Sequence, residues 1–263
     1  MRVLAIANQK GGVGKTTTAI NLGTALAATG KRVVIFDTDP QGNASTGLDI
    51  APEARGISSY DVLVGHRSLS GAILPTKVPG LFIVPGDANL SGVETELMAG
   101  LRPQHRLRDG IAAFEAEEKG AGYDYMLIDC PPSLNILTVN ALTAANAVLV
   151  PLQTEFFALE GLVQLMATIE AVRQNLNAEL EIQGIVLTMY DKRTKLSEQV
   201  AQEVRQHFPD KVYAAVIPRN VKLSEAPSYG VPAIVYDLAS AGSQAYLELA
   251  RELIERERVL LAA

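Results

Sequence analysis

The sequence Asn8-Gln9-Lys10-Gly11-Gly12-Val13-Gly14-Lys15-Thr16-Thr17 joins an apolar, β-branched run to a helix pattern. The apolar run covers residues 3–7. The helix pattern covers residues 16–29 and stops at Gly30, a residue type that often ends helices. A buried strand, a glycine-rich loop and a helix in this order are what a phosphate-binding loop requires. The stretch therefore predicts that this chain binds the phosphates of a nucleotide.

The residue types in this loop suit a nucleoside triphosphate. Glycine has no Cβ, so backbone N–H groups can turn inward around a phosphate, and the start of a helix adds free N–H donors. Lys15 can reach the β- and γ-phosphates, the Thr16 hydroxyl can ligate Mg²⁺, and Thr17 is placed near the α-phosphate. We expect ATP with Mg²⁺, held by Lys10, Gly11, Gly12, Val13, Gly14, Lys15, Thr16 and Thr17.

The loop departs from the common pattern G-x-x-x-x-G-K-[ST]. That pattern requires glycine at position 9, where this chain has Gln9, and the chain carries a second lysine, Lys10, followed by a glycine pair. A glycine-rich turn without function is the alternative interpretation. The lysine–threonine pair coincides with a strand before it and a helix after it, and this coincidence favours the phosphate loop.

Short apolar runs alternate with helix patterns along the whole chain. The runs cover residues 3–7, 33–36, 81–84, 125–128, 147–150, 185–187 and 212–217. Near-continuous apolar strands that alternate with helices are typical of a mainly parallel sheet covered on both faces. We therefore predict an α/β fold, with residues 1–263 forming a single-domain P-loop fold whose twisted sheet carries helices on both faces. Ser133 is expected to cap a helix over residues 134–145.

Two of the predicted strands end in acidic residues. The run 33–36 continues into Asp37-Thr38-Asp39, whose two carboxylates at i and i+2 point the same way. A polar exit from a strand is the simpler alternative. The run 125–128 ends at Asp129, which resembles the Walker B carboxylate that holds Mg²⁺ in P-loop enzymes. Beside a phosphate loop, the first pair predicts a catalytic loop and Asp129 predicts a metal ligand.

Residues 10–17, Lys-Gly-Gly-Val-Gly-Lys-Thr-Thr, resemble the deviant Walker A motif of the ParA/MinD class of P-loop ATPases. The resemblance implies that Lys10 crosses a dimer interface to the partner's nucleotide. A cation delivered in trans would stabilise the charge that shifts to the β–γ bridge as that bond breaks. The resemblance also implies that Asp39 positions the attacking water. The implied catalytic residues are Lys10, Lys15 and Asp39, and the implied metal residues are Thr16, Asp37 and Asp129.

Three further segments resemble chromosomal ParA partition ATPases of the Soj type. They are residues 39–47 (Asp-Pro-Gln-Gly-Asn-Ala-Ser-Thr-Gly), 155–161 (Glu-Phe-Phe-Ala-Leu-Glu-Gly) and 217–228 (Ile-Pro-Arg-Asn-Val-Lys-Leu-Ser-Glu-Ala-Pro-Ser). The resemblance implies an ATP hydrolase, weak alone, whose ATP-bound sandwich dimer binds double-stranded DNA non-specifically. A ParB-like centromere-binding protein would stimulate hydrolysis and release the dimer. Such a protein is expected to be cytoplasmic and nucleoid-associated.

The same resemblance implies further details of the site and of the domain organisation. It implies adenine contacts from Met189, Pro218 and Asn220, which lie just after predicted strands. The chain starts directly at its first predicted strand. We therefore expect no N-terminal helix-turn-helix domain, and no operator-specific repression.

Basic residues are concentrated towards the C-terminus. The formal net charge of the chain is −6, but residues 188–232 hold seven basic and five acidic residues, a net charge of +2. Ordinary surface variation explains the charge alone equally well. Together with the resemblance, the pattern predicts that Arg193 and Lys222 contact DNA phosphates on a common face of the dimer.

Three other functions are compatible with a P-loop fold. A MinD-like division-site ATPase needs a membrane-binding amphipathic tail, and residues 247–263 are neither basic nor aromatic enough for one. An iron–sulfur protein needs two cysteine ligands per subunit, whereas this chain has only Cys130, which we interpret as a small buried residue. A P-loop metabolic ligase would turn over without DNA or a protein activator. No apolar stretch approaches the length of a membrane span, so no membrane contact is expected.

Overall fold

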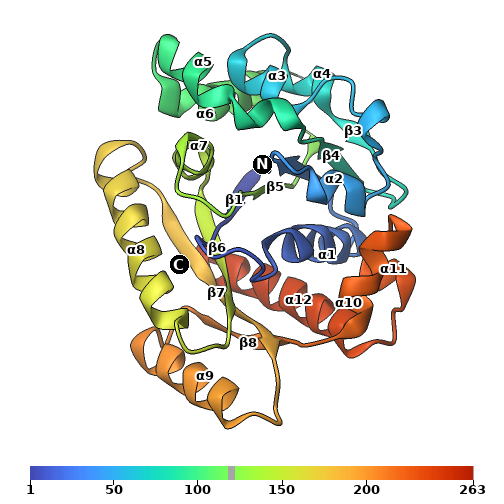
Figure 1. Cartoon of the computed structure of the whole chain (residues 1–263), viewed down its shortest axis with the longest axis vertical. Coiled ribbons are helices and arrows are strands. Elements are labelled where there is room, and N and C mark those ends of the chain that lie inside the picture. The colour runs from blue at the N-terminus through green and yellow to red at the C-terminus, as the bar shows by residue number, and fades with distance from the viewer. Residues whose placement is uncertain (118–121, 263) are drawn as a thin grey trace.

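A computed structural model describes residues 1–117 and 122–262, and these residues contain one eight-stranded sheet (Figure 1). The strand order across the sheet is β3-β4-β2-β5-β1-β6-β7-β8. The strands are β1 (Arg2–Ile6), β2 (Val33–Asp37), β3 (Leu74–Pro75), β4 (Leu81–Val84), β5 (Tyr125–Asp129), β6 (Ala147–Gln153), β7 (Glu181–Tyr190) and β8 (Val212–Pro218). Neighbouring strands run parallel, except that the edge strand β3 pairs antiparallel with β4. The predicted α/β fold with a mainly parallel sheet is confirmed.

Helices cover both faces of this sheet, as predicted (Figure 1). One face carries α1 (Lys15–Ala28), α2 (Asn43–Gly47), α10 (Val221–Glu225), α11 (Ala233–Tyr236) and α12 (Ala241–Ala262). The other carries α3 (Ser59–Val64), α4 (Leu69–Ala72), α5 (Val93–Ala99), α6 (Arg106–Ala116), α7 (Ile136–Ala144), α8 (Ala158–Asn175) and α9 (Lys195–His207). Alternate strand residues feed the two cores: Leu4 and Ile6 belong to the first, and Val3 and Ala5 to the second. This division follows from the two-residue period of a strand.

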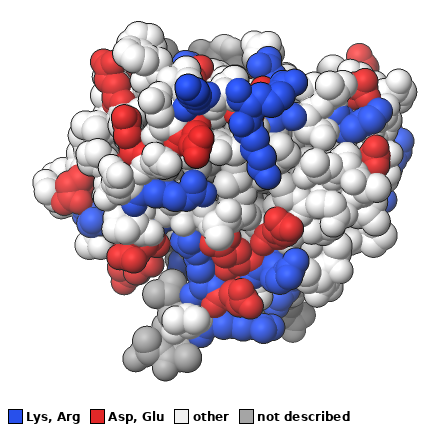
Figure 2. All heavy atoms as spheres, turned by 90° about the horizontal axis from the view of Figure 1, so that it is seen from below, with Lys and Arg blue, Asp and Glu red and all other residues white. Residues whose placement is uncertain are grey.

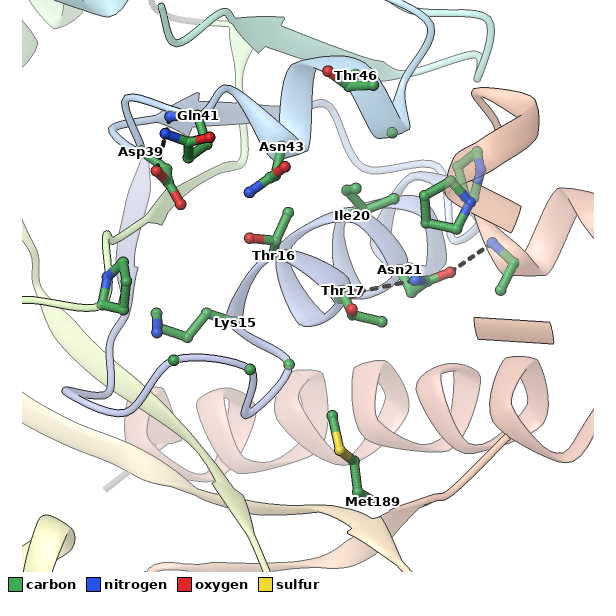
Figure 3. A pocket seen from close by; sticks show the side chains of 18 of the residues that line it. Lys15, Thr16, Thr17, Ile20, Asn21, Asp39, Gln41, Asn43, Thr46 and Met189 are labelled. Carbon is green, nitrogen blue, oxygen red and sulfur yellow. Dashed lines mark hydrogen bonds between the residues drawn. The ribbon is translucent and has the colours of Figure 1, made fainter. Parts of the chain in front are cut away.

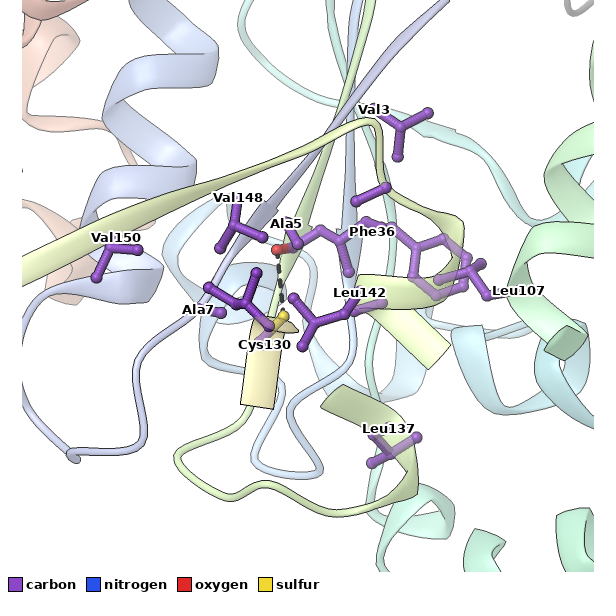
Figure 4. Close-up of a cluster of buried hydrophobic side chains, with 14 of the residues drawn as sticks. Val3, Ala5, Ala7, Phe36, Leu107, Cys130, Leu137, Leu142, Val148 and Val150 are labelled. Carbon is purple, nitrogen blue, oxygen red and sulfur yellow. Dashed lines mark hydrogen bonds between the residues drawn. The ribbon is translucent and has the colours of Figure 1, made fainter. Parts of the chain in front are cut away.

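Cys130 lies inside the core on the α7 side of the sheet (Figure 4). Its side chain is packed with those of Ala7, Leu142 and Val148, and its thiol donates to the carbonyl of Ile128 at 3.8 Å. Burial raises the pKa of this thiol well above its ordinary value. The interpretation of Cys130 as a small interior residue is confirmed, because a buried thiol of raised pKa is a poor nucleophile.

The C-terminal helix α12 belongs to the core. It packs against α1 and β8, and its residues Tyr246, Leu249 and Leu253 are fully buried. The Tyr246 hydroxyl also bonds the hydroxyl of Thr18, at the start of α1, at 3.1 Å. The apolar face of the tail is therefore used inside the protein. Among the residues described, none of the helices combines the length and the apolar character that crossing a bilayer requires.

Strand β1 lies at the centre of the sheet, between β5 and β6. The chain winds outward through β2 and β4 on one side of β1 and through β6, β7 and β8 on the other. Ligands of open α/β sheets bind at the carboxyl ends of the strands, where the winding reverses. The register pairs Asp37 at the end of β2 with Asp129 at the end of β5. The end of β1 is paired with Asp129, so the loop that follows β1 emerges beside Asp129, with Asp37 one strand further away.

One predicted helix boundary is wrong. The helix expected over residues 134–145 with Ser133 as its cap begins at Ile136, and Asn135 caps it. The Asn135 carboxamide oxygen accepts from the backbone N–H of Leu137 at 3.1 Å and of Thr138 at 3.4 Å. Serine and asparagine are similar cap formers, so the sequence alone did not separate the two positions.

Candidate nucleotide-binding site

The loop between β1 and α1 has the backbone of a phosphate cradle. Gly12 and Gly14 have φ of 76° and 92°, a left-handed conformation that side chains other than glycine rarely adopt. Gly14 is the N-terminal cap residue of α1, and within the described chain no side chain caps this helix and its first turn holds no acidic residue. The first N–H groups of α1 are therefore free to bind an anion.

This loop forms one wall of a pocket of about 480 Å³ (Figure 3). The pocket is lined by Gly11, Gly12, Gly14, Lys15, Thr16, Thr17, Ile20, Asn21, Asp39, Gln41, Asn43, Thr46, Gly47, Pro132, Met189, Pro227, Val231, Pro232 and Ala233. In Figure 3 the side chains of Lys15, Thr16 and Thr17 face this pocket from the start of α1. Asp39 faces it from the loop after β2, and Asn43 faces it from the start of α2. Six of the eight phosphate-loop residues predicted from sequence line this pocket together with Asp39, whereas Lys10 and the buried Val13 do not.

Lys15 is a buried cation in the wall of this pocket. Its side chain is only 7% exposed, and its amine donates to the carbonyl of Lys10 at 2.9 Å. Burial lowers the pKa of this amine, and the nearby Asp129 carboxylate partly opposes the shift. A buried cation needs compensating negative charge. An anionic phosphate in the pocket would supply it.

Asp129 has the features of a metal ligand. It is fully buried, and among the residues that the structure describes neither of its carboxylate oxygens has a hydrogen-bond partner. Burial and the neighbouring Asp37 raise its pKa well above the ordinary value, and the nearby Thr16 hydroxyl and Lys15 amine partly oppose this rise. Mg²⁺ prefers carboxylate, hydroxyl, water and phosphate oxygens. The two open oxygens of Asp129 and the Thr16 hydroxyl in the adjoining pocket therefore fit a magnesium ion held together with a nucleotide.

Asp37 differs from Asp129, although both carboxylates are buried on adjacent strands. One Asp37 oxygen accepts from the N–H and hydroxyl of Ser45, at 3.0 and 2.7 Å, and the other accepts from the N–H of Asp39 at 3.1 Å. Burial raises its pKa to about 6 in spite of these bonds. Asp37 thus holds the loop that carries Asp39. Its direct ligation of Mg²⁺ stays a prediction.

Lys10 points away from the pocket that its own loop forms. It is absent from the pocket lining, its side chain is 46% exposed, and its amine pairs with the carboxylate of Glu155 just before α8. This placement leaves Lys10 at the surface of the described protein. Its action on a partner's nucleotide stays a prediction.

The structure separates the three residues expected to contact adenine. Met189, at the end of β7, lines the phosphate-loop pocket. The Thr188 hydroxyl, one residue earlier, donates to the carbonyl of Val13 at 2.8 Å and holds this strand end against the loop. Pro218 and Asn220 line a different cavity instead. The Asn220 side chain accepts from the N–H of Lys222 and caps α10.

Sequence reasoning missed the wall of the pocket opposite Met189. Pro227, Val231, Pro232 and Ala233 form it. The N–H of Ala233 donates to the Asn21 carboxamide of α1 at 2.9 Å, across 212 residues of sequence. The segment 217–228 was noted for its resemblance, but its own pattern carries no signal that the chain folds back onto α1.

A second cavity, of about 1080 Å³, carries most of the positive charge expected in the C-terminal third. Its lining includes the four basic residues Lys192, Arg193, Arg205 and Arg219, with Asp191 and Glu248. Figure 2 views the molecule from the side of α9 and β8, and the Lys and Arg side chains there are interspersed with acidic ones. The charge is therefore local to the cavity and does not cover the whole face.

The two residues predicted to bind DNA differ in their surroundings. Arg193 is 86% exposed and pairs with Asp191 through two bonds of 2.9 and 2.7 Å. This pairing lowers the pKa of Asp191 to about 2. Lys222 lies outside the cavity lining, bonded to Glu225 at 3.0 Å and 5.3 Å from the ring centre of Tyr236. The structure therefore groups Arg193, but not Lys222, with the other cations.

The fold and the site together define a P-loop nucleotide-binding protein of the α/β class. A family model described as an AAA domain matches residues 1–182. The chain is 66% identical over 258 residues to the chromosome partitioning protein ParA of Caulobacter vibrioides, covering 98% of this chain and 96% of that protein. It is 49% identical to the sporulation initiation inhibitor protein Soj of Bacillus subtilis, covering 96% and 98% of the two chains. The chain belongs to the ParA/Soj family of P-loop ATPases.

One solved structure extends this comparison. Cobyrinic acid a,c-diamide synthase from Mycobacterium smegmatis, solved with an ATP analogue and magnesium, is 36% identical to the chain with a TM-score of 0.84. The match covers 98% of this chain and 96% of that one. The fold is thus shared with a relative whose site was observed with a nucleotide and a metal ion.

Proposed function

We propose that this protein is a chromosome-partition ATPase that hydrolyses ATP to ADP and phosphate with Mg²⁺. The observation that carries the proposal is the buried Asp129 carboxyl beside Thr16 and Lys15 of the phosphate loop, whose two oxygens have no hydrogen-bond partner of good geometry among the described residues. A carboxylate left in this state is costly unless a cation joins it. Relatives named as partition proteins at 66% and 49% identity support the same function.

In this proposal the phosphate loop binds and orients the triphosphate. The N–H groups at the start of α1 and the Lys15 amine hold the phosphates, and Lys15 leaves the carbonyl of Lys10 to do so. Thr16 and Asp129 would hold Mg²⁺, which neutralises charge on the β- and γ-phosphates. Asp39 faces the same pocket and would orient the attacking water. Met189 and the Pro227–Ala233 wall would enclose the base.

Dimerisation would complete the site. Lys10 is exposed beside its own pocket and does not line it, which supports its delivery to the nucleotide of a second copy. A lysine supplied in trans makes hydrolysis depend on the dimer. The ATP-bound dimer would bind DNA non-specifically and associate with the nucleoid. A ParB-like protein would stimulate the weak basal hydrolysis and release the dimer.

The DNA contacts would come from phosphate-binding cations at the second cavity. Lys192, Arg193, Arg205 and Arg219 gather there, and phosphate contacts carry no sequence information. A dimer doubles the number of these cations, and affinity rises steeply with the number of phosphates neutralised. ATP can therefore control DNA binding without touching the DNA surface itself.

A metabolic ligase is a second candidate, favoured by the likeness to a diamide synthase. The two functions differ in what turnover requires. A partition ATPase should be slow alone and accelerate with DNA and a ParB-like protein, whereas a ligase should turn over with a small acceptor and need neither. A MinD-like function is disfavoured, because the apolar face of α12 packs against α1 and β8.

The test is ATP turnover by the purified protein with and without duplex DNA and the cognate ParB-like protein. Asp39→Ala should lower stimulated turnover about 100-fold while Mg-ATP still binds in calorimetry. Lys15→Ala is the matched control, because it should lose ATP binding itself. Turnover that ignores both DNA and the partner would exclude the partition function, and normal turnover by Asp39→Ala would move the catalytic role elsewhere.

A further inference from the structure

Arg55 is a buried arginine behind the loop that carries Asp39. It follows the short 3-10 helix Pro52–Ala54, and its side chain is 8% exposed. Its guanidinium donates to the carbonyl of Gly86 at 3.0 Å and to the hydroxyl of Thr46 at 2.9 Å. It also reaches the carbonyl of Gly42 at 3.3 Å. One side chain thus joins the loop after β2 to the loop after β4.

The charge of Arg55 is balanced by neutral acceptors alone. Among the residues described, no carboxylate lies within ion-pair distance of it. Burying an unpaired charge is unfavourable, and an apolar side chain of similar size would fill the space without that cost. Bonds from a charged donor to buried carbonyls offset part of the cost. Unlike an apolar side chain, the guanidinium holds the groups that accept its hydrogen bonds in fixed positions relative to one another.

One glycine lets the guanidinium approach this closely, and a second lets the loop after β4 pack against the loop after β2. Gly42 has φ of 59°, and a Cβ at this position would overlap the guanidinium of Arg55. A Cβ at Gly86 would lie 2.8 Å from the carbonyl oxygen of Asp39 and 2.9 Å from the carboxyl carbon of Asp37. The two loops and Arg55 are therefore packed without spare volume. A displacement of Arg55 should therefore also displace the backbone of Asp39.

The other side of this loop, together with helix α2, faces the nucleotide pocket. Asp39, Gln41, Asn43 and Thr46 all line that pocket. Thr46 belongs to both sides, since its hydroxyl accepts from Arg55 and donates to the carbonyl of Gly42 at 3.1 Å. Arg55 therefore supports the catalytic loop from behind without lining the pocket.

We propose that Arg55 is a positioning residue that sets the place of Asp39 for ATP hydrolysis, by tying residues 39–46 to the end of β4. This inference rests on the proposed ATP hydrolysis. Arg55 acts through Asp39 and does not contact the nucleotide. A catalytic group displaced by about 1 Å can lose about 100-fold in rate. Removing the guanidinium should therefore lower kcat and leave the affinity for Mg-ATP nearly unchanged.

The experiment compares Arg55→Met, Arg55→Lys and Arg55→Ala in the full chain, with the exposed Arg67→Met as the matched control. Arg55→Met should bind Mg-ATP within about threefold of wild type in calorimetry, while kcat falls about 10- to 100-fold. Arg55→Lys should fall nearly as far, because an ammonium group is a point charge without the planar fork of donors. Added guanidinium chloride should restore turnover to Arg55→Ala, which leaves a space for it, and not to Arg55→Met. Arg67→Met should match wild type.

Two results would overturn the proposal. One is unchanged kcat in Arg55→Met. The other is a parallel loss of kcat, Mg-ATP affinity and thermal stability without guanidinium rescue, which would make Arg55 a fold residue only. Amide hydrogen exchange tests the role of Arg55 in positioning the loop even if the protein does not hydrolyse ATP. If wild type hydrolyses no ATP, the amides of Gly42 and Thr46 should still exchange faster in Arg55→Met, and unchanged exchange would reject the role of Arg55.

Discussion

At the scale of single residues, two buried aspartates on neighbouring strands do different work. Asp37 accepts bonds from Ser45 and Asp39, whereas Asp129 has no hydrogen-bond partner among the residues described. Both carboxyls have raised pKa values because burial disfavours their charge. The bonded carboxylate organises the catalytic loop, and the open one is available to a cation. The two residues are chemically identical, and the groups around each carboxyl determine its role.

This pair predicts a pH dependence of stability. Burial raises the pKa of Asp37 from 3.8 to about 6 in the folded protein. A group with a raised folded pKa stabilises the fold fully below its unfolded pKa, and that stability is lost as pH rises through the folded value. The contribution of Asp37 to the melting temperature in EDTA should therefore fall between about pH 4 and pH 6. The contribution of Asp37 is on the order of 2–3 kcal/mol.

Calorimetric melting of wild type and Asp37→Asn across this range checks the prediction, because the asparagine cannot ionise. The fall should be shallower in the variant. Since a metal ligand must be deprotonated, added Mg-ATP should stabilise wild type more as pH rises. An equal pH slope in wild type and Asp37→Asn would show that the buried carboxyl does not titrate in this range.

At the scale of elements, the presence or absence of a side-chain cap at a helix N-terminus determines whether the first N–H groups of that helix can bind a ligand. The start of α1 is left without a side-chain cap in the described chain, which frees its N–H groups for phosphate. The start of α7, just after Asp129 and Pro132, is capped by Asn135. An open helix end serves binding and a capped end serves stability. The unpaired N–H groups at a helix start are thus left open for a ligand in α1 and bonded to a side chain in α7, at the same edge of the sheet.

The cap at Asn135 makes a testable prediction. Asn135→Ala removes the acceptor of two backbone N–H groups and should lower the free energy of unfolding by about 1 kcal/mol. Ser133→Ala is the matched control and should change it by less than about 0.5 kcal/mol. Urea denaturation measures both. If Ser133→Ala proved the more destabilising variant, the helix would begin where its sequence pattern alone placed it.

At the scale of the whole molecule, the protein keeps its nucleotide chemistry and its surface cations apart. The phosphate-loop pocket and the basic cavity have no lining residue in common. Met189 lines the first and Tyr190 the second, so the end of β7 borders both. Under the proposed function, dimerisation is what connects nucleotide state to DNA affinity. Two predictions test this connection.

The first concerns Lys10, which pairs with Glu155 and does not line its own pocket. Lys10→Ala should keep nucleotide binding within about tenfold of wild type, because the phosphate contacts of Lys15 remain. It should lose ATP-dependent dimerisation or stimulated turnover. Light scattering with a slowly hydrolysed ATP analogue measures the dimer. A normal dimer with normal stimulated turnover would contradict a role in trans.

The second concerns the DNA surface. Arg193→Ala combined with Lys222→Ala should weaken binding to two unrelated duplexes equally, while the ATP-driven dimer stays intact. Each phosphate contact contributes about 0.9 to the slope of log affinity against log salt. The double variant removes two cations from each protomer, four from the dimer, and should therefore lower that slope by about 3.6. Gel shifts with ATP or ADP across a salt series measure it.

The single variants separate the two cations. Arg193 shares a cavity with three other basic residues, whereas Lys222 is bonded to Glu225 outside that cavity. Arg193→Ala should therefore have the larger effect. Wild-type DNA affinity in the double variant would place the DNA-binding surface elsewhere. DNA affinity that is the same with ATP and with ADP would contradict the proposed control of DNA binding by ATP.

Much of the fold and the phosphate site could be predicted from local patterns. The apolar runs lie on seven of the eight strands in the described chain, and six of the residues 10–17 line the nucleotide pocket. Local patterns succeed here because strand burial and phosphate binding depend on residues close together in sequence. The two-residue edge strand β3 was missed, because so short a strand shows no period.

Only the tertiary structure decided which polar groups have partners. The open carboxylate of Asp129, the bond from Ala233 to Asn21 and the support of Gly86 by Arg55 each depend on contacts between distant segments. Periodicity reports which face of an element is buried, but it does not say what that face meets. Whether a polar group has a hydrogen-bond partner, and whether a charge is buried, depends on these contacts between distant segments. The amino-acid sequence therefore determined the class of protein and its phosphate loop, while the assembled fold determined which aspartate is free and which residues close the pocket.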